Sequence, residues 1–183
     1  MNHSKISSRY AKALLLSAKE KNILDTVEKD FLFIEKLIQQ VPDFHYLITD
    51  PFIKNKKKYD ALFSIIGKKV TNLTLDFIKM IFENKRDEFF IDIVRVFLDK
   101  YRKEKGIKKV VLTLTREIGQ ESKDNIINAV KKAYNADVEL TEKIKPELIG
   151  GFILRVEDLQ LDSTVANKLK KLKKELTSTI NNI

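Results

Sequence analysis

The chain has 183 residues, a formal net charge of +9 and no cysteine. The absence of cysteine excludes disulfides, thiolate metal sites and cysteine nucleophiles, and two histidines offer little for a histidine metal site. No apolar run approaches the roughly 20 residues that a membrane-spanning helix requires.

Residues 4–105 are predicted to be helical throughout. Glycine and proline are scarce in this part of the chain, and apolar residues recur every three or four positions. Pro42 interrupts the pattern because proline cannot continue a helical hydrogen-bond ladder. Asn84 is expected to adopt the left-handed conformation that ends a helix. After a first helix that begins near residue 4, the predicted helices span 22–41, 43–49, 54–67, 72–83 and 86–104. We therefore predict a six-helix bundle in residues 1–105, with one short helix.

The periodicity changes after Gly106. The predicted elements are a strand at 110–115, a helix at 120–134, strands at 137–144, 151–156 and 159–162, and a helix at 163–180. Glu157 and Asp158 form the predicted hairpin between the last two strands. The final helix has one narrow apolar stripe on an otherwise lysine-rich surface. Residues 106–183 are therefore expected to form a small α/β domain with a short sheet and two helices, which makes the whole chain α+β.

The glycine pair Gly150-Gly151 is expected to be structural. A dinucleotide-binding fingerprint places its glycines between a strand and a helix, so that the helix N-terminus faces the phosphate. Here the pair leads into a strand, and no Lys-Ser or Lys-Thr follows it as in a phosphate-binding loop. We interpret the pair as a bend or a close backbone approach at the entrance to the sheet.

Four segments, taken in order, resemble one protein family. They are SRYAKALLLSAKEKN at 8–22, FIKMIFENKRDEFFIDIVRVF at 77–97, the stretch from Val138 to Glu157 that contains the glycine pair, and LQLDSTVANKLKKLKKEL at 159–176. They are spread from residue 8 to residue 176, and the chain, over nearly its whole length, resembles the delta subunit of bacterial and plastid F-type ATP synthases, called OSCP in mitochondria. The chain departs from the family at Glu157, where glycine is common, at Ser163-Thr164, where Gly-Ser is common, and near Ala166, where arginine is frequent.

The resemblance implies a non-catalytic stator subunit of a proton-translocating ATP synthase, without catalytic residues, cofactor or metal. Residues 1–105 would hold the N-terminal helix of an alpha subunit at the top of the catalytic head. Residues 106–183 would hold the C-terminal end of the b-type peripheral stalk. The implied location is peripheral, on the cytoplasmic side of the cell inner membrane, with the plastid thylakoid as an alternative.

The first and fifth predicted helices carry unusually wide apolar surfaces. On a helical wheel each covers an arc of roughly 200°, whereas a helix packed on one side needs about 100°. Both helices could be central in the bundle, or both could line a groove for an incoming amphipathic helix. The resemblance favours the groove. The candidate groove residues are Ile6, Tyr10, Ala13, Ser17, Phe77 and Met80.

An RNA-binding function and an enzymatic function are the alternatives to a stator subunit. A basic helical RNA- or ribosome-associated protein needs a continuous positive face with interleaved aromatic residues, but the aromatic residues here fall mostly on inward positions. An enzyme with paired carboxylates could use Asp87-Glu88 or Glu157-Asp158, although adjacent residues on a helix do not face a common point. For the basic final helix, pairing with an acidic or amphipathic stalk helix and a solvated lysine face over a packed leucine stripe both remain open.

Overall fold

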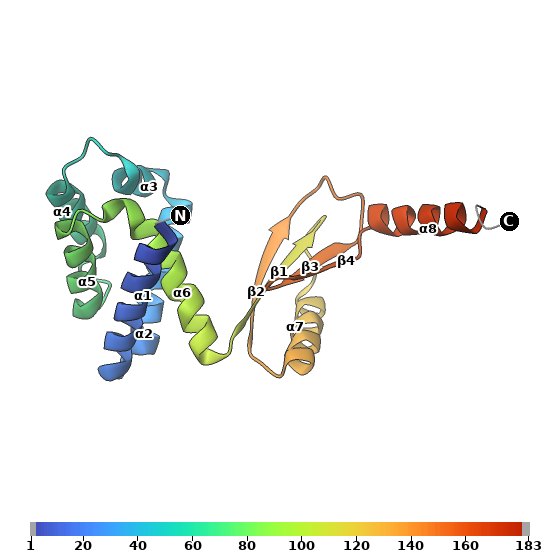
Figure 1. Ribbon diagram of the computed structural model, residues 1–183, viewed down its shortest axis with the longest axis horizontal. Coiled ribbons are helices and arrows are strands. Elements are labelled where there is room, and N and C mark those ends of the chain that lie inside the picture. Colours follow the sequence, from blue (N-terminus) through green and yellow to red (C-terminus); the bar gives the residue numbers. More distant parts are fainter. Residues whose placement is uncertain (1–2, 181–183) are drawn as a thin grey trace. The chain divides into compact units, whose positions relative to one another are not determined.

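The chain divides into two compact units, one up to Tyr101 and one from Arg102 onward. The computed structural model describes the backbone of residues 3–180 and the side chains of residues 5–173. Figure 1 shows helices in the first unit and the sheet in the second, so the predicted α+β class is confirmed. The division falls inside a helix, whereas the sequence analysis placed it at Gly106, directly after that helix.

An aromatic core joins the helices of the first unit. Phe31 on α2 packs on Phe97 of α6 with ring centroids 4.4 Å apart, and on Phe77 of α5 at 6.3 Å. Apolar residues at helical spacing on three helices therefore meet at one centre. The elements are α1 (His3–Glu20), α2 (Leu24–Gln40), α3 (Pro42–Thr49), α4 (Asn55–Ile66), α5 (Asn72–Glu83), the 3-10 helix η1 (Asp87–Phe89) and α6 (Phe90–Lys105).

The end of α5 differs from the prediction. Asn84 is not left-handed, with φ of −76°, because its N–H still donates to the carbonyl of Met80 at 3.1 Å. Lys85 takes the left-handed conformation instead, with φ of 55°. The N–H of Arg86 then donates to the carbonyl of Ile81 at 3.0 Å, the six-residue bond of a Schellman ending.

A buried carboxylate on α2 fixes the start of α5. Asp30 is 6% exposed, and its Oδ2 accepts hydrogen bonds from the backbone N–H of Thr71 at 2.8 Å and from the hydroxyl of Thr74 at 2.7 Å. The hydroxyl of Thr71 donates to the same oxygen at 2.8 Å and also accepts from the N–H of Thr74. The N-terminus of α5 is therefore anchored to α2 by charge-assisted bonds.

The second unit is a four-stranded sheet in the order β2-β1-β3-β4. Strand β1 is parallel to β2, with α7 as the crossover, while the β1/β3 and β3/β4 pairs are antiparallel. Val110, Val130 and Val156 form the centre of its core. The elements are β1 (Lys108–Leu114), α7 (Gln120–Tyr134), β2 (Val138–Ile144), β3 (Phe152–Val156), β4 (Leu159–Asp162) and α8 (Val165–Ile180).

The predicted hairpin at Glu157 and Asp158 is confirmed. Glu157 has φ of 51°, the left-handed conformation that glycine adopts most readily. This explains physically why the glycine of the resembling family suits the position. Two contacts help to hold the left-handed backbone of Glu157 in place. Its Oε1 lies 2.9 Å from Lys108 Nζ, and the guanidinium of Arg155 donates to its carbonyl at 3.0 Å.

The two adjacent glycines differ in how tightly they are enclosed. Gly151 has φ of +82°, and a Cβ at this position would collide with the carbonyl oxygen of Ser163 and lie 2.9 Å from Thr164 Cα. Gly150 is less restricted, since a Cβ there would meet only a methyl group of Val165 at 3.1 Å. At Gly151 the chain entering β3 passes directly against the segment that leads into α8.

We expect Gly151→Ala to destabilise the second unit by about 2–4 kcal/mol, because it combines a left-handed backbone with a collision against main-chain atoms. Calorimetric unfolding of the intact chain measures the effect. Gly119→Ala is the matched control: a Cβ there meets nothing within 4 Å, so the loss should stay below about 1 kcal/mol. Equal losses in the two variants would contradict the close approach at Gly151.

Candidate functional site

A cleft opens between α1 and α5 in the first unit, and we call it the α1/α5 cleft. Its volume is about 250 Å³. The α5 wall is a stripe with the spacing of one helix face, and α1 supplies the facing wall. The lining residues are Ala13, Leu14 and Ser17 on α1 and Leu73, Asp76, Phe77 and Met80 on α5.

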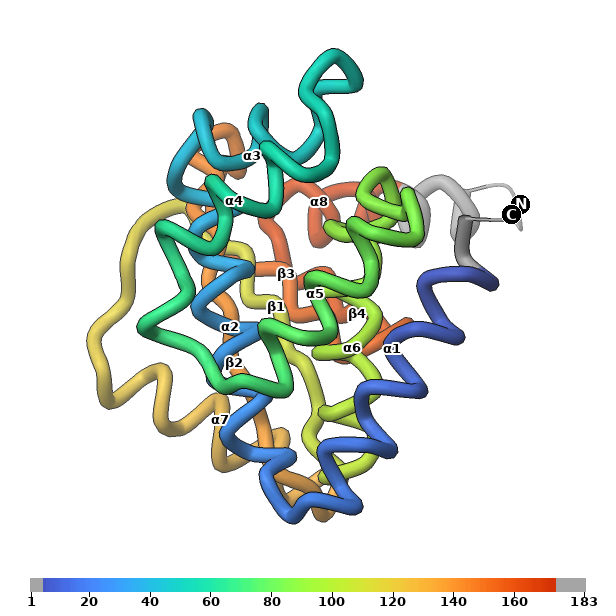
Figure 2. The backbone as a smooth tube through the Cα atoms, turned by 90° about the vertical axis from the view of Figure 1, so that its left-hand side faces the viewer, coloured from blue at the N-terminus to red at the C-terminus, as the bar shows by residue number. Residues whose placement is uncertain are grey.

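The floor of the cleft is closed and apolar. Leu14 is 2% exposed and Phe77 is 6% exposed. The ring of Tyr10 meets the ring of Phe77 edge-on at 6.4 Å, which ties α1 to α5 where the two helices run side by side (Figure 2). Ala13 and Met80 remain exposed at the rim. The cleft is therefore open in the isolated chain.

The structure brings four of the six predicted groove residues together in this cleft. Ala13, Ser17, Phe77 and Met80 line it, whereas Ile6 and Tyr10 are half-buried on α1 and do not. Leu14, Leu73 and Asp76 also line the cleft and were not among the predicted residues. The spacing of Leu73 and Asp76 from Phe77 and Met80, one helical turn each, is the signal that could have identified those two.

A second apolar cleft lies in the other unit, beside α7, and we call it the α7/β4 cleft. Its volume is about 470 Å³. Leu159 and Leu161 of β4 are 66% and 55% exposed, although they pair with the core-facing Val156 and Leu154 of β3. Helix α7 thus leaves the β4 side of this sheet face uncovered. The lining residues are Ile126, Ala129, Val130, Ala133, Tyr134, Phe152, Leu154, Val156, Leu159, Gln160 and Leu161.

The described part of the α8 apolar stripe is exposed. Val165, Leu169 and Leu172 are 40%, 61% and 55% accessible. A leucine stripe packed inside the unit, one of the two alternatives for this helix, is therefore not what the described residues show. The remaining stripe residues, Leu176 and Ile180, have side chains outside the described residues.

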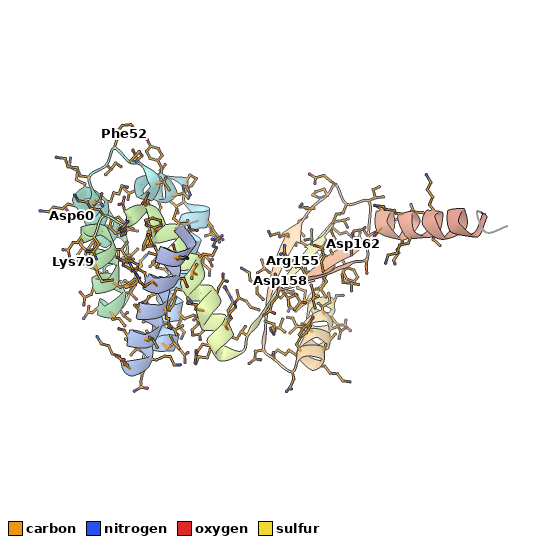
Figure 3. The ribbon with its side chains drawn as sticks, viewed as in Figure 1. Phe52, Asp60, Lys79, Arg155, Asp158 and Asp162 are labelled. Carbon is orange, nitrogen blue, oxygen red and sulfur yellow. The ribbon has the colours of Figure 1, made fainter. Side chains whose placement is uncertain are left out.

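The start of α8 is nevertheless well defined. The hydroxyl of Thr164 donates to Asp162 Oδ1 at 2.7 Å, and the N–H of Asn167 donates to the hydroxyl of Thr164 at 3.2 Å. The pKa of Asp162 is held below its ordinary value, mainly by the hydrogen bond from the Thr164 hydroxyl and also by the one from the Thr164 backbone N–H. Figure 3 labels Asp162 where β4 gives way to α8. The capping network orients the helix even though its apolar stripe is exposed.

The segment KNKKK at 54–58 is rich in lysine, but it does not form a uniform positive face. It borders a hollow of about 830 Å³ between α4 and α5 that is lined by acidic as well as basic residues. Lys58 is 2% exposed, and its ammonium donates to the carbonyl of Ile48 at 2.9 Å and to Asp87 Oδ2 at 2.5 Å. Asn55 Nδ2 donates to the other oxygen of Asp87 at 2.8 Å. Asp87 is therefore a structural counter-ion, and Lys58 is unavailable to a nucleic acid.

The described residues contain neither a metal-binding cluster nor a membrane-spanning helix. Among the described residues, no group of three or more histidine, aspartate and glutamate side chains is arranged to hold a metal ion. Over the same residues, every helix is too short or too polar to cross a membrane.

Comparisons with known proteins agree with one another. The family model described as "ATP synthase delta (OSCP) subunit" matches residues 6–176. The ATP synthase subunit delta of Cytophaga hutchinsonii is 32% identical over 100% of both chains, and that of Amoebophilus asiaticus is 35% identical over 93% of each. A chain of the Toxoplasma gondii mitochondrial ATP synthase hexamer shares the fold, with a TM-score of 0.76 at 24% identity over 93% of this chain and 97% of that one.

Proposed function

Because the chain belongs to the ATP synthase delta (OSCP) subunit family, we propose that it is a non-catalytic stator subunit of a proton-translocating F-type ATP synthase. It links the catalytic head to the peripheral stalk and keeps the head from turning with the rotor. Membership of this family favours the stator over an RNA-binding function. In this proposal the subunit is peripheral and lies on the cytoplasmic side of the cell inner membrane.

The first unit binds the N-terminal helix of an alpha subunit in the α1/α5 cleft. The observation that carries this proposal is an open cleft between two helices, with a buried apolar floor and with Ala13 and Met80 accessible at its rim. An amphipathic helix laid in such a cleft buries its apolar face against Phe77 and Leu14. Met80 is unbranched and polarizable, so it adapts to the side chains that it meets.

The second unit binds the C-terminal end of the b-type stalk. It offers two apolar surfaces, the α7/β4 cleft and the exposed stripe of Leu169 and Leu172 on α8. Contiguous apolar surface that is exposed to solvent, as in this cleft and stripe, is typical of a binding site. The lysines that flank the stripe favour a stalk helix with acidic residues beside its apolar face.

The mechanism is mechanical and needs no chemistry in this chain. Rotation in the head transmits torque to the catalytic ring, and the stator has to hold the ring still while ions drive the rotor. Both contacts must therefore dissociate slowly, and burial of apolar anchors in preformed clefts provides this. Anchoring α5 through Asp30 keeps the α1/α5 cleft from deforming under load.

Titration of the intact chain with two synthetic peptides tests the proposal. One peptide carries the alpha-subunit N-terminus and the other the stalk C-terminus, both taken from the genome that encodes this chain. We expect both to bind, and neither to displace the other. If neither peptide shows saturable binding to the folded chain, the proposed function is wrong.

Leu169→Ser is expected to weaken binding of the stalk peptide about tenfold, because it removes a large apolar side chain from the exposed stripe. Binding of the alpha peptide should not change. Lys170→Ser, which truncates the neighbouring residue on the polar side, should weaken stalk binding by less than about threefold. An equal loss in both variants would assign the contact to charge and not to the leucine stripe.

A further inference from the structure

One charged residue stands inside the otherwise apolar and hydroxyl lining of the α1/α5 cleft. Asp76 lies on the α5 stripe, one turn after Leu73 and one turn before Met80, and directly beside Phe77. Its side chain is exposed in the free chain. Within the described residues no hydrogen bond or ion pair engages its carboxylate. The carboxylate is therefore open to solvent and has no ion-pair partner among the described residues.

The one basic residue of α5 is paired with another acid and not with Asp76. Lys79, labelled in Figure 3, lies one turn after Asp76, but its ammonium is 3.9 Å from Glu83 Oε1 in an i,i+4 pair. On the facing wall the lining residues are Ala13, Leu14 and Ser17, none of which carries a charge. The chain thus supplies no counter-ion to Asp76 from the lining of its own cleft.

A helix that fills the cleft removes water from this carboxylate. A carboxylate that loses its water without gaining a partner is strongly destabilising, whereas a cation placed opposite it offsets that loss. A wholly apolar helix face is therefore a poor fit to a cleft that contains Asp76. An opposing lysine or arginine turns the same residue into a determinant of register and orientation.

We infer that Asp76 is a specificity-determining residue of the α1/α5 cleft, and that the helix bound there carries one lysine or arginine within its apolar face. Because Leu73 and Met80 flank Asp76 by one turn on each side, the cation of the partner is flanked by apolar residues one turn before and one turn after it. An arginine is the better fit because its planar guanidinium can bond both carboxylate oxygens. This inference rests on the proposed binding of a head helix in the cleft.

Calorimetric titration tests it, with the intact chain and a synthetic peptide of the alpha-subunit N-terminus from the same genome, at about 50 and 300 mM salt. We expect the parent affinity to fall with salt, Asp76→Asn to bind about three- to tenfold more weakly, and its affinity to depend less on salt. Asp76→Lys should bind more weakly still. A peptide in which the basic residue is replaced by glutamate should restore binding to this variant.

The control is Asp60→Asn, which removes an exposed carboxylate on α4, away from the cleft (Figure 3). It should leave both the affinity and its salt dependence unchanged. If Asp76→Asn binds as tightly as the parent with the same salt dependence, Asp76 is only a hydrated rim residue and the inference is overturned, while the proposed cleft stands. If the parent chain does not bind the peptide at all, the proposed binding of the alpha-subunit helix in the cleft fails.

Discussion

Replacing Ala13 by glutamate is expected to weaken binding of the alpha-subunit peptide by about 100-fold or more. Ala13 is exposed at the rim of the α1/α5 cleft, so the free chain accommodates the larger side chain in water. When the partner helix closes the cleft, the new carboxylate is buried against apolar side chains, while the one cation inferred on the partner faces Asp76. It also adds to the negative charge of Asp76. Titration of the intact chain with the peptide measures the loss.

Leu16→Glu is the matched control for this substitution. Leu16 lies on the same helix and is 47% exposed, but it does not line the cleft. It introduces the same side chain with the same change of charge, so the peptide should bind within about threefold of the parent affinity. Both variants should show the parent circular dichroism spectrum. An equal and large loss in the two would show that general charge, and not the cleft, governs binding.

Asp87→Ala is expected to destabilise the first unit by about 3–5 kcal/mol, the largest stability loss that we anticipate for a polar side chain. The substitution leaves the ammonium of Lys58, which is 2% exposed, with the carbonyl of Ile48 but without a counter-ion. It also removes one of the two acceptors for the amide of Asn55, which keeps its hydrogen bond to the carbonyl of Phe82. Calorimetric unfolding of the intact chain measures the loss.

Two further variants separate the buried charge from other effects of the substitution. Asp92→Ala breaks an exposed pair with Arg95, whose side chain is 69% accessible, and should cost less than about 1 kcal/mol. Adding Lys58→Met to Asp87→Ala removes the stranded ammonium and should recover most of the stability. A double variant no more stable than Asp87→Ala would contradict the explanation by uncompensated charge.

The helices and strands follow from local patterns in the sequence. The α5 and α7 boundaries at 72–83 and 120–134 match the prediction, because apolar periodicity and flanking turn residues act within a few positions. The left-handed residue after α5 is Lys85 and not the predicted Asn84, since the N–H of the C-cap residue Asn84 still donates to the carbonyl of Met80. The 3-10 helix η1 was not distinguished from α6, because the predicted helix at 86–104 included its residues as a first turn.

The residues of the candidate sites could be predicted only in part, because tertiary packing decides which apolar residues stay accessible. The wide apolar arcs of α1 and α5 indicated Ala13 and Met80, but a wheel cannot show where a neighbouring helix closes the surface. Ile6 and Tyr10 lie outside the lining for this reason. Burial of Lys58 within a basic run could not be inferred either, since its counter-ion Asp87 is distant in the sequence.

The central claim is that the α1/α5 cleft holds an alpha-subunit helix in the assembled enzyme, and a photo-cross-link tests it most directly. Benzoylphenylalanine would be placed at Met80, which is 39% exposed on the cleft rim, or at Leu16 on α1 outside the cleft. Irradiation of the purified ATP synthase and peptide mapping by mass spectrometry then identify the partner. We expect the probe at position 80 to cross-link to the N-terminal helix of an alpha subunit, and the probe at position 16 not to do so. An assembled enzyme in which position 80 yields no alpha-subunit product, or only stalk products, would contradict the claim.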